Sequence, residues 1–178
     1  ESANALMSMR GLVDVLIPRG GKGLIRACVE NSKVPVIETG AGNCHLYIDS
    51  AADMTKAINI AVNAKCSRPS VCNAIETLLV HTDVAAEFLP MLQDALAPYN
   101  VDLRGCERSR AIIGGISAAT DEDYATEYDD YILALKVVDT LDEAIEHINK
   151  YSTGHSEAIV TEDKEAADRF QREIDSVA

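Results

Sequence analysis

The sequence has 178 residues, of which 47% are hydrophobic and 25% charged, a composition typical of a soluble protein with one substantial core. Its formal net charge of −13 argues against nucleic acid and against an anionic membrane surface as partners. No apolar run approaches the roughly 20 residues that span a bilayer, so we expect no membrane association.

The charge is unevenly distributed along the chain. Residues 1–80 hold eight Lys/Arg and seven Asp/Glu, whereas residues 81–178 hold eight and 22. The first stretch is therefore the better place for an anionic ligand. The five cysteines form no CxxC pair and the four histidines no HxxxH motif, which argues against a disulfide framework and against a metal site. We expect a protein of the reducing cytoplasm.

Short β-rich runs alternate with longer amphipathic segments. The predicted strands are 14–18, 34–39, 44–49, 77–81, 102–106, 132–138 and 157–161, and the predicted helices are 21–30, 52–65, 84–97, 141–151 and 164–177. Ser50, Asp83 and Thr140 are the predicted N-caps of three helices. This alternation predicts an α/β fold of three layers, a mostly parallel sheet with helices on both faces. Residues 118–130 are expected to form an exposed loop or a short surface helix.

A glycine-rich turn with two basic residues joins the first predicted strand to a helix. It contains Arg19, Gly20, Gly21 and Lys22 in the string DVLIPRGGKGLI. Glycines let the backbone approach a ligand closely, and a helix N-terminus offers free N–H groups to a phosphate. The string is neither a Rossmann GxGxxG nor a Walker loop, so an ordinary strand-to-helix turn stays an alternative.

Glu38 ends the second predicted strand, just before Gly40-Ala41-Gly42 in PVIETGAGNCHLYID. The carboxyl end of a strand is where α/β proteins place their sites, and a buried carboxylate with a raised pKa can act as a general base. The alternative is an ordinary solvated glutamate. His45, on the next strand, is expected to be a hydrogen-bonded core residue.

Cys72 lies in a turn between a predicted helix and a predicted strand, within NAKCSRPSVCNAIETLLVH. We expect the turn to lead into a short helix, where N–H dipoles and the cations Lys65 and Arg68 would lower the pKa of the thiol. A thiolate there is a nucleophile, and the Cys72 N–H could stabilise the oxyanion formed on attack. The alternative, a small buried hydrophobe, suits Cys28 and Cys106 better.

Four strings occur in order along the chain: PRGGKGLI, PVIETGAGNCH, SRPSVCNAIETLLVH and YSTGHSEAIVTED. Together they closely resemble the γ-glutamyl phosphate reductases, also called glutamate-5-semialdehyde dehydrogenases, a family of the aldehyde dehydrogenase superfamily. The resemblance implies that residues 1–40 end a nucleotide-binding domain and that residues 41–178 form a catalytic domain of the aldehyde dehydrogenase type, cut before its last strand. We therefore expect a fragment that is inactive alone.

The resemblance also implies roles for individual residues. Cys72 matches the catalytic cysteine, Glu38 the general base of the aldehyde-oxidising members, and Glu127 a glutamate that contacts the nicotinamide ribose. The expected cofactor-binding residues are Arg19, Gly20, Gly21 and Glu127, and the substrate or phosphate residues are Arg68, Ser70, Asn73 and His155.

The implied reaction is the NADPH-dependent reduction of L-glutamyl 5-phosphate to L-glutamate 5-semialdehyde, with release of phosphate, in proline biosynthesis. Its partners would be a small acyl phosphate and, in the full-length protein, further copies of the same chain. Three alternatives stay open: an aldehyde-oxidising dehydrogenase of the same superfamily, the reductase half of a bifunctional kinase–reductase, and a non-catalytic domain that keeps the fold.

Overall fold

The computed structural model describes residues 2–20, 22–38 and 40–178. The chain divides into two compact units, Glu1–Ala41 and Gly42–Ala178, which we call unit 1 and unit 2 and describe separately. No helix of the described residues is long and apolar enough to cross a membrane.

Unit 1 contains two helices, α1 (Ser2–Met7) and α2 (Lys22–Asn31). The strands predicted at 14–18 and 34–39 are wrong, because the described residues there form one parallel bridge, between Leu16 and Val36. A two-stranded pair by itself is marginally stable. The side chains of Val15, Ile17 and Ile37 are exposed, so no apolar face holds these segments in extended ladders within unit 1.

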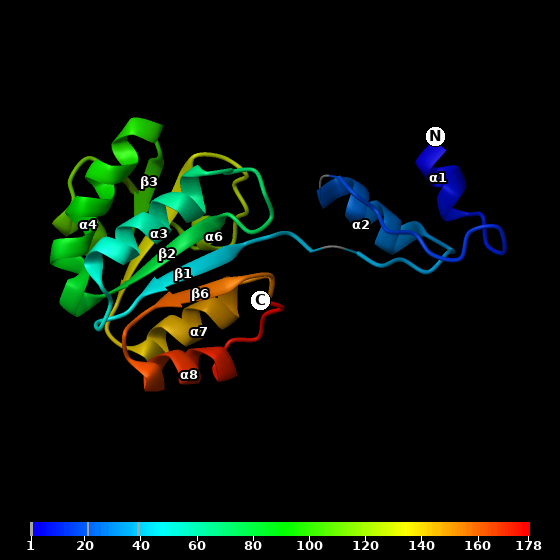
Figure 1. Cartoon of the computed structure of the whole chain (residues 1–178). Helices are drawn as coiled ribbons and strands as arrows, with labels where there is room; N and C mark the ends of the chain where they lie inside the picture. The colour runs from blue at the N-terminus through cyan, green and yellow to red at the C-terminus, as the bar shows by residue number, and fades with distance from the viewer. Residues whose placement is uncertain (1, 21, 39) are drawn as a thin grey trace. The chain divides into compact units, whose positions relative to one another are not determined.

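Unit 2 is built on a six-stranded sheet in which every strand pair is parallel. The strand order is β4-β3-β5-β2-β1-β6 (Figure 1). The strands are β1 (Cys44–Ile48), β2 (Ile75–His81), β3 (Asp102–Gly105), β4 (Ser117–Ala118), β5 (Ile132–Val138) and β6 (Glu157–Val160). The central strands are almost wholly buried, which explains their nearly continuous apolar sequences.

Helices cover both faces of this sheet, as Figure 1 shows, and the predicted three-layer α/β fold is confirmed. One face carries α3 (Met54–Cys66), α4 (Thr82–Leu96) and α5 (Glu107–Ile112), and the other carries α7 (Leu141–Tyr151) and α8 (Lys164–Glu173). The remaining helices are α6 (Asp121–Tyr124) and the 3₁₀ turn η1 (Ala97–Tyr99).

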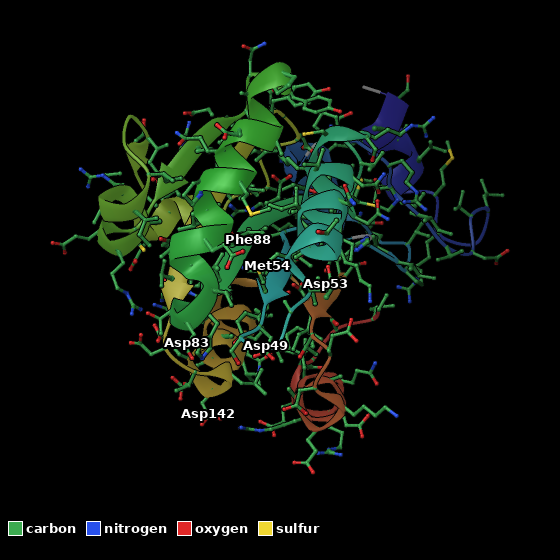
Figure 2. All side chains as sticks on the ribbon, turned by 60° about the vertical axis from the view of Figure 1, so that its left-hand side comes forward. Asp49, Asp53, Met54, Asp83, Phe88 and Asp142 are labelled. Carbon is green, nitrogen blue, oxygen red and sulfur yellow. The ribbon has the colours of Figure 1, made fainter. Side chains whose placement is uncertain are left out.

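The alternation of side chains along the strands makes a separate core on each face of the sheet. Leu46 and Leu78 pack under α3 and α4 together with Phe88, and the partly buried Met54 of α3 packs against this core. Figure 2 labels Phe88 and Met54. Tyr47 and Leu79 point to the opposite face, under α7 and α8.

Two of the three predicted N-caps are wrong by a few residues. The carboxylate of Asp53, rather than the Ser50 hydroxyl, accepts from the N–H of Lys56, and His81 rather than Asp83 caps α4. The third is confirmed, because the Thr140 hydroxyl accepts from the N–H of Glu143 at 3.2 Å.

The segment 118–130 does contain a short helix, α6, but this helix does not lie wholly on the surface. Asp123 and Tyr124 are buried, because the Asp123 carboxylate binds Arg104 at 2.7 Å and the Tyr124 hydroxyl donates to the Leu135 carbonyl. The sequence pattern also failed to predict α1, α5 and the two-residue strand β4.

Candidate active site

Three predicted site residues of unit 2 lie on loops that each lead into a strand of the parallel sheet. Cys72 precedes β2, Glu127 precedes β5 and His155 precedes β6. These loops therefore meet at the amino ends of the strands. Sites in open α/β sheets usually lie at the carboxyl ends, so this edge would not be chosen from topology alone.

Of the five cysteines, all of which the structure describes, only Cys72 is exposed. It lies on the loop of residues 67–74, which we call the Cys72 loop. The expected short helix after Cys72 is wrong: Ala74 N donates to the Val71 carbonyl at 2.9 Å in a turn, and β2 begins at Ile75.

The backbone of Cys72 is held tightly against the start of β1. The Cys44 thiol donates to the Cys72 carbonyl at 3.2 Å. Burial raises the pKa of Cys44 to about 12, so this sulfur keeps its proton and remains a donor. A Cβ atom on Gly42 would lie 2.5 Å from the Cys72 carbonyl carbon and 2.8 Å from its Cα, so only glycine fits at this position.

Glu127 also contacts Gly42, the residue that packs against the Cys72 backbone. Its carboxylate accepts from the N–H of Gly42 at 2.6 Å, so it fixes the glycine that packs against Cys72. Sequence reasoning did not foresee this contact, which joins residues 85 positions apart. The role of Glu127 toward a nicotinamide ribose stays a prediction.

Asn43 is a further residue that sequence reasoning missed. Its side chain is buried, and the amide Nδ2 donates to the carbonyls of Tyr124 and Tyr151, each at 2.8 Å. Its backbone N–H donates to the Thr153 hydroxyl at 3.0 Å. Asn43 therefore ties the start of β1 to the ends of α6 and α7 and to the loop that carries His155.

His155 is half-buried beside the same thiol that binds the Cys72 carbonyl. Its Nδ1 lies 2.8 Å from the Ser156 hydroxyl and 3.9 Å from the Cys44 sulfur. The structure thus brings the Cys72 loop and His155 together around Cys44. His45 is the buried core residue that was predicted, with Nδ1 at 3.1 Å from a Glu157 oxygen.

Arg68, Ser70 and Asn73 share the Cys72 loop, and all three are exposed. A guanidinium, a hydroxyl and an amide next to a thiol can together hold an anionic group. Lys65 does not add to them, because its ammonium is buried and binds the Glu76 carboxylate at 2.6 Å. The prediction that Lys65 serves as a cation for Cys72 is therefore wrong.

The remaining predicted residues belong to unit 1. Arg19 and Gly20 are exposed just before α2, and Gly20 has a φ of +148°, a backbone conformation that favours glycine. Gly21 lies outside the described residues. The first N–H groups of α2 have no intrahelical partners, so this turn has the chemistry to hold a phosphate. Glu38 is exposed, and together with Ile25 and Arg26 it lines a hollow on the surface of unit 1.

Among the residues that the structure describes, no group of three or more His, Cys, Asp or Glu side chains is arranged to hold a metal ion. The groups that the Cys72 loop exposes include a thiol, a hydroxyl, an amide and the Arg68 guanidinium.

Comparisons with known proteins show which proteins this chain is similar to. The aldehyde dehydrogenase family profile matches residues 18–128. The γ-glutamyl phosphate reductase of Heliobacterium modesticaldum is 59% identical over 178 residues, which are 100% of this chain and 43% of that protein. The crystal structure of γ-glutamyl phosphate reductase from Thermotoga maritima matches with a TM-score of 0.94 and 49% identity, over 98% of this chain and 42% of that chain. An engineered glycolyl-CoA reductase with bound NADP⁺ has the same fold, with a TM-score of 0.73 and 18% identity over 97% of this chain and 47% of that chain.

The chain belongs to the aldehyde dehydrogenase family. It spans less than half the length of the relatives that it matches.

Proposed function

We propose that this chain is the nucleophile-bearing part of a γ-glutamyl phosphate reductase, which reduces L-glutamyl 5-phosphate to L-glutamate 5-semialdehyde and releases phosphate. The resemblance of the four strings and the names of relatives at 53–59% identity support this substrate. The role in proline biosynthesis belongs to the same proposal, as do the cytoplasmic location and self-association of the whole protein.

The exposed thiol of Cys72, on a loop whose backbone is fixed by Cys44 and Gly42, is the observation that carries the proposal. The thiolate attacks the acyl carbon, and the carbon–oxygen bond to the phosphate breaks. Phosphate leaves with the bonding electrons, and a thioester with Cys72 remains. After reduction of this thioester to a thiohemiacetal, the carbon–sulfur bond breaks, and the aldehyde and the Cys72 thiolate are formed.

The neighbouring groups would bind and orient the substrate. The Arg68 guanidinium and the Ser70 hydroxyl can hold the phosphate, and the Asn73 amide and the Cys72 N–H can stabilise the oxyanion. His155 can reach the same substrate from the loop before β6. Water must be excluded from the thioester, because hydrolysis would yield glutamate instead of the aldehyde.

Each unit has residues with the chemistry to bind a part of a nicotinamide dinucleotide. In unit 1, Arg19 and Gly20, with the N–H groups at the start of α2, would hold a phosphate. In unit 2, the Glu127 carboxylate would bind a ribose hydroxyl. The bound cofactor supplies the hydride. The engineered glycolyl-CoA reductase, which has the same fold, binds NADP⁺, and this supports NADPH as the proposed cofactor.

An aldehyde-oxidising dehydrogenase of the same family would share Cys72 and Glu38, so these residues do not distinguish it from a γ-glutamyl phosphate reductase. A requirement for phosphate in the reverse reaction does distinguish them. The test is the rate of NADP⁺ reduction by the whole protein with glutamate semialdehyde, with and without phosphate. We expect the rate to require phosphate and to vanish in Cys72→Ser. An equal rate without phosphate would identify an aldehyde-oxidising dehydrogenase and overturn the proposal.

For the chain alone we expect no turnover, because its relatives are more than twice as long. NADPH-dependent turnover by the isolated 178 residues would contradict this expectation.

A further inference from the structure

A buried ion pair closes the base of the Cys72 loop. The Lys65 ammonium, at the end of α3, binds the Glu76 carboxylate, at the start of β2, at 2.6 Å. Both side chains are fully enclosed, with exposed fractions of 0% and 1%. The two residues stand 11 positions apart, and the loop that carries Cys72 lies between them.

A β-bulge lies at Glu76, at the start of β2. Cys44 pairs with Ile75 and His45 pairs with Thr77, so Glu76 is an extra residue that has no partner on β1. As a result, Ile75 and Leu78 both enter the core under α3 and α4, although strict alternation would put them on opposite faces. The bulge changes the side of Ile75, whereas Glu76 shares the face of Leu78, two residues further on, and meets Lys65 at the end of α3.

Stability alone gives a poor account of this ion pair. Removing two charges from water costs several kcal/mol for each ion, and apolar side chains of similar volume commonly serve as well or better. Burial raises the pKa of Glu76 to about 7, which reflects this cost even with Lys65 beside it. An ion pair fixes the distance and relative direction of its two side chains, here Lys65 and Glu76, more closely than apolar packing does.

The pair is also connected to the other contacts that fix Cys72. The second oxygen of Glu76 accepts from the N–H of Asp129 at 3.3 Å. Asp129, which has a φ of +56°, is two residues from Glu127, whose carboxylate holds Gly42 against the Cys72 backbone. Glu76 therefore holds two segments in place. One is the end of the Cys72 loop, and the other is the segment of Glu127 and Asp129, which binds Gly42.

We infer that Lys65 and Glu76 are positioning residues, whose ion pair fixes the Cys72 loop in the geometry from which the thiolate attacks. This inference rests on the proposed role of Cys72 as the nucleophile. Neither side chain touches the substrate, so the expected effect of losing the pair is a change in turnover number, because misplacement of a reacting atom by about 1 Å can cost roughly 100-fold in rate.

The test replaces the pair by apolar residues of similar size, Lys65→Met with Glu76→Leu, in the whole protein. The matched control is Lys56→Met with Glu162→Leu, which removes an exposed ion pair of 2.7 Å that also involves α3. Backbone hydrogen exchange of residues 67–74 and 78–81 reports the fixation of the loop and of β2, and kcat and KM for the phosphate-dependent reaction report its consequence.

We expect the loop amides of the Lys65/Glu76 variant to exchange at least tenfold faster, with the β2 amides unchanged. The kcat should fall at least tenfold while KM changes less than threefold, and the control should match the wild type. A folded variant with wild-type loop exchange and a kcat within twofold of the wild type would overturn the inference. If the double variant does not fold, Glu76→Gln keeps the shape and removes the charge, and the same criteria apply.

The two proposals can fail separately. Wild-type protein without phosphate-dependent activity would refute the proposed function, and the exchange of the loop amides would still decide whether the ion pair fixes the loop.

Discussion

The packing of Gly42 against Cys72 leads to a quantitative prediction for Gly42→Ala. The added Cβ would overlap the Cys72 carbonyl oxygen, its nearest neighbour, and would lie 2.5 Å from the carbonyl carbon, about 0.9 Å short of ordinary contact between carbon atoms at 3.4 Å. The obstacle is backbone, which cannot rotate away as a flexible side chain can. The Cys72 loop must therefore move by more than about 1 Å, or the Gly42–Glu127 hydrogen bond of 2.6 Å must break.

Overpacking of this kind costs about 1–3 kcal/mol, and the lost hydrogen bond to a carboxylate adds roughly 1.5–3 kcal/mol if it breaks. We expect the free energy of unfolding to fall by at least about 2 kcal/mol and kcat to fall by roughly 100-fold. Urea denaturation measures the first effect, and the phosphate-dependent assay of the whole protein measures the second.

Gly114→Ala is the matched control, because no atom lies within 4 Å of the Cβ that it would add and its φ is not positive. We expect it to change stability by less than about 1 kcal/mol. Equal stability and activity of Gly42→Ala and Gly114→Ala would refute the reasoning, since the close approach of Gly42 to Cys72 would then have no consequence.

Three further predictions concern the surroundings of the site. Asn43→Ala should lower the free energy of unfolding by about 1–3 kcal/mol, because the buried carbonyl of Tyr124 and the part-buried carbonyl of Tyr151 lose their shared donor. Chemical denaturation measures this, and a loss below about 0.5 kcal/mol would contradict it. At pH 8, iodoacetamide should label the exposed Cys72 long before Cys44, because burial raises the pKa of the Cys44 thiol to about 12. Peptide mass spectrometry measures the two labelling rates, and equal rates would show the expectation to be wrong. Burial lowers the pKa of His147 to about 3, so the folded protein excludes a proton that the unfolded chain binds below pH 6.5. The stability that neutral His147 provides should thus be complete above pH 6.5 and decrease by about 1.4 kcal/mol per pH unit as the pH falls toward 3. Unfolding of wild type and His147→Gln between pH 7 and 4.5 tests this, and parallel pH profiles would refute it.

The sheet of unit 2 could be predicted because its strands are buried on both faces and have continuous apolar sequences. The run ILALKVV became β5, and TLLVH became most of β2. The segments around Leu16 and Val36 have similar compositions, yet they form only one bridge. Composition predicts an extended segment there, but a strand also needs a partner strand that it can pair with over several residues, and local sequence does not report one.

The exposed position of Cys72 could be predicted from its own loop, whereas the residues that hold this loop could not. Cys72 stands among turn-forming and charged residues, which marks it locally. The contact between Gly42 and Glu127 joins distant positions, and that between Lys65 and Glu76 joins the end of a helix to the start of a strand across the Cys72 loop. One signal was present: Lys65 follows Ala57 and Ala61 at intervals of four, on the buried face of α3.

The measurement that tests the central claim most directly compares the modification of Cys72 with the loss of activity in the whole protein. Limiting iodoacetamide is added at neutral pH, the alkylated fraction of each cysteine is measured by peptide mass spectrometry, and phosphate-dependent NADP⁺ reduction is assayed in the same samples. We predict that activity falls in direct proportion to unmodified Cys72 and that glutamate semialdehyde with phosphate slows both changes. Full activity in protein whose Cys72 is completely alkylated would contradict the assignment of Cys72 as the nucleophile.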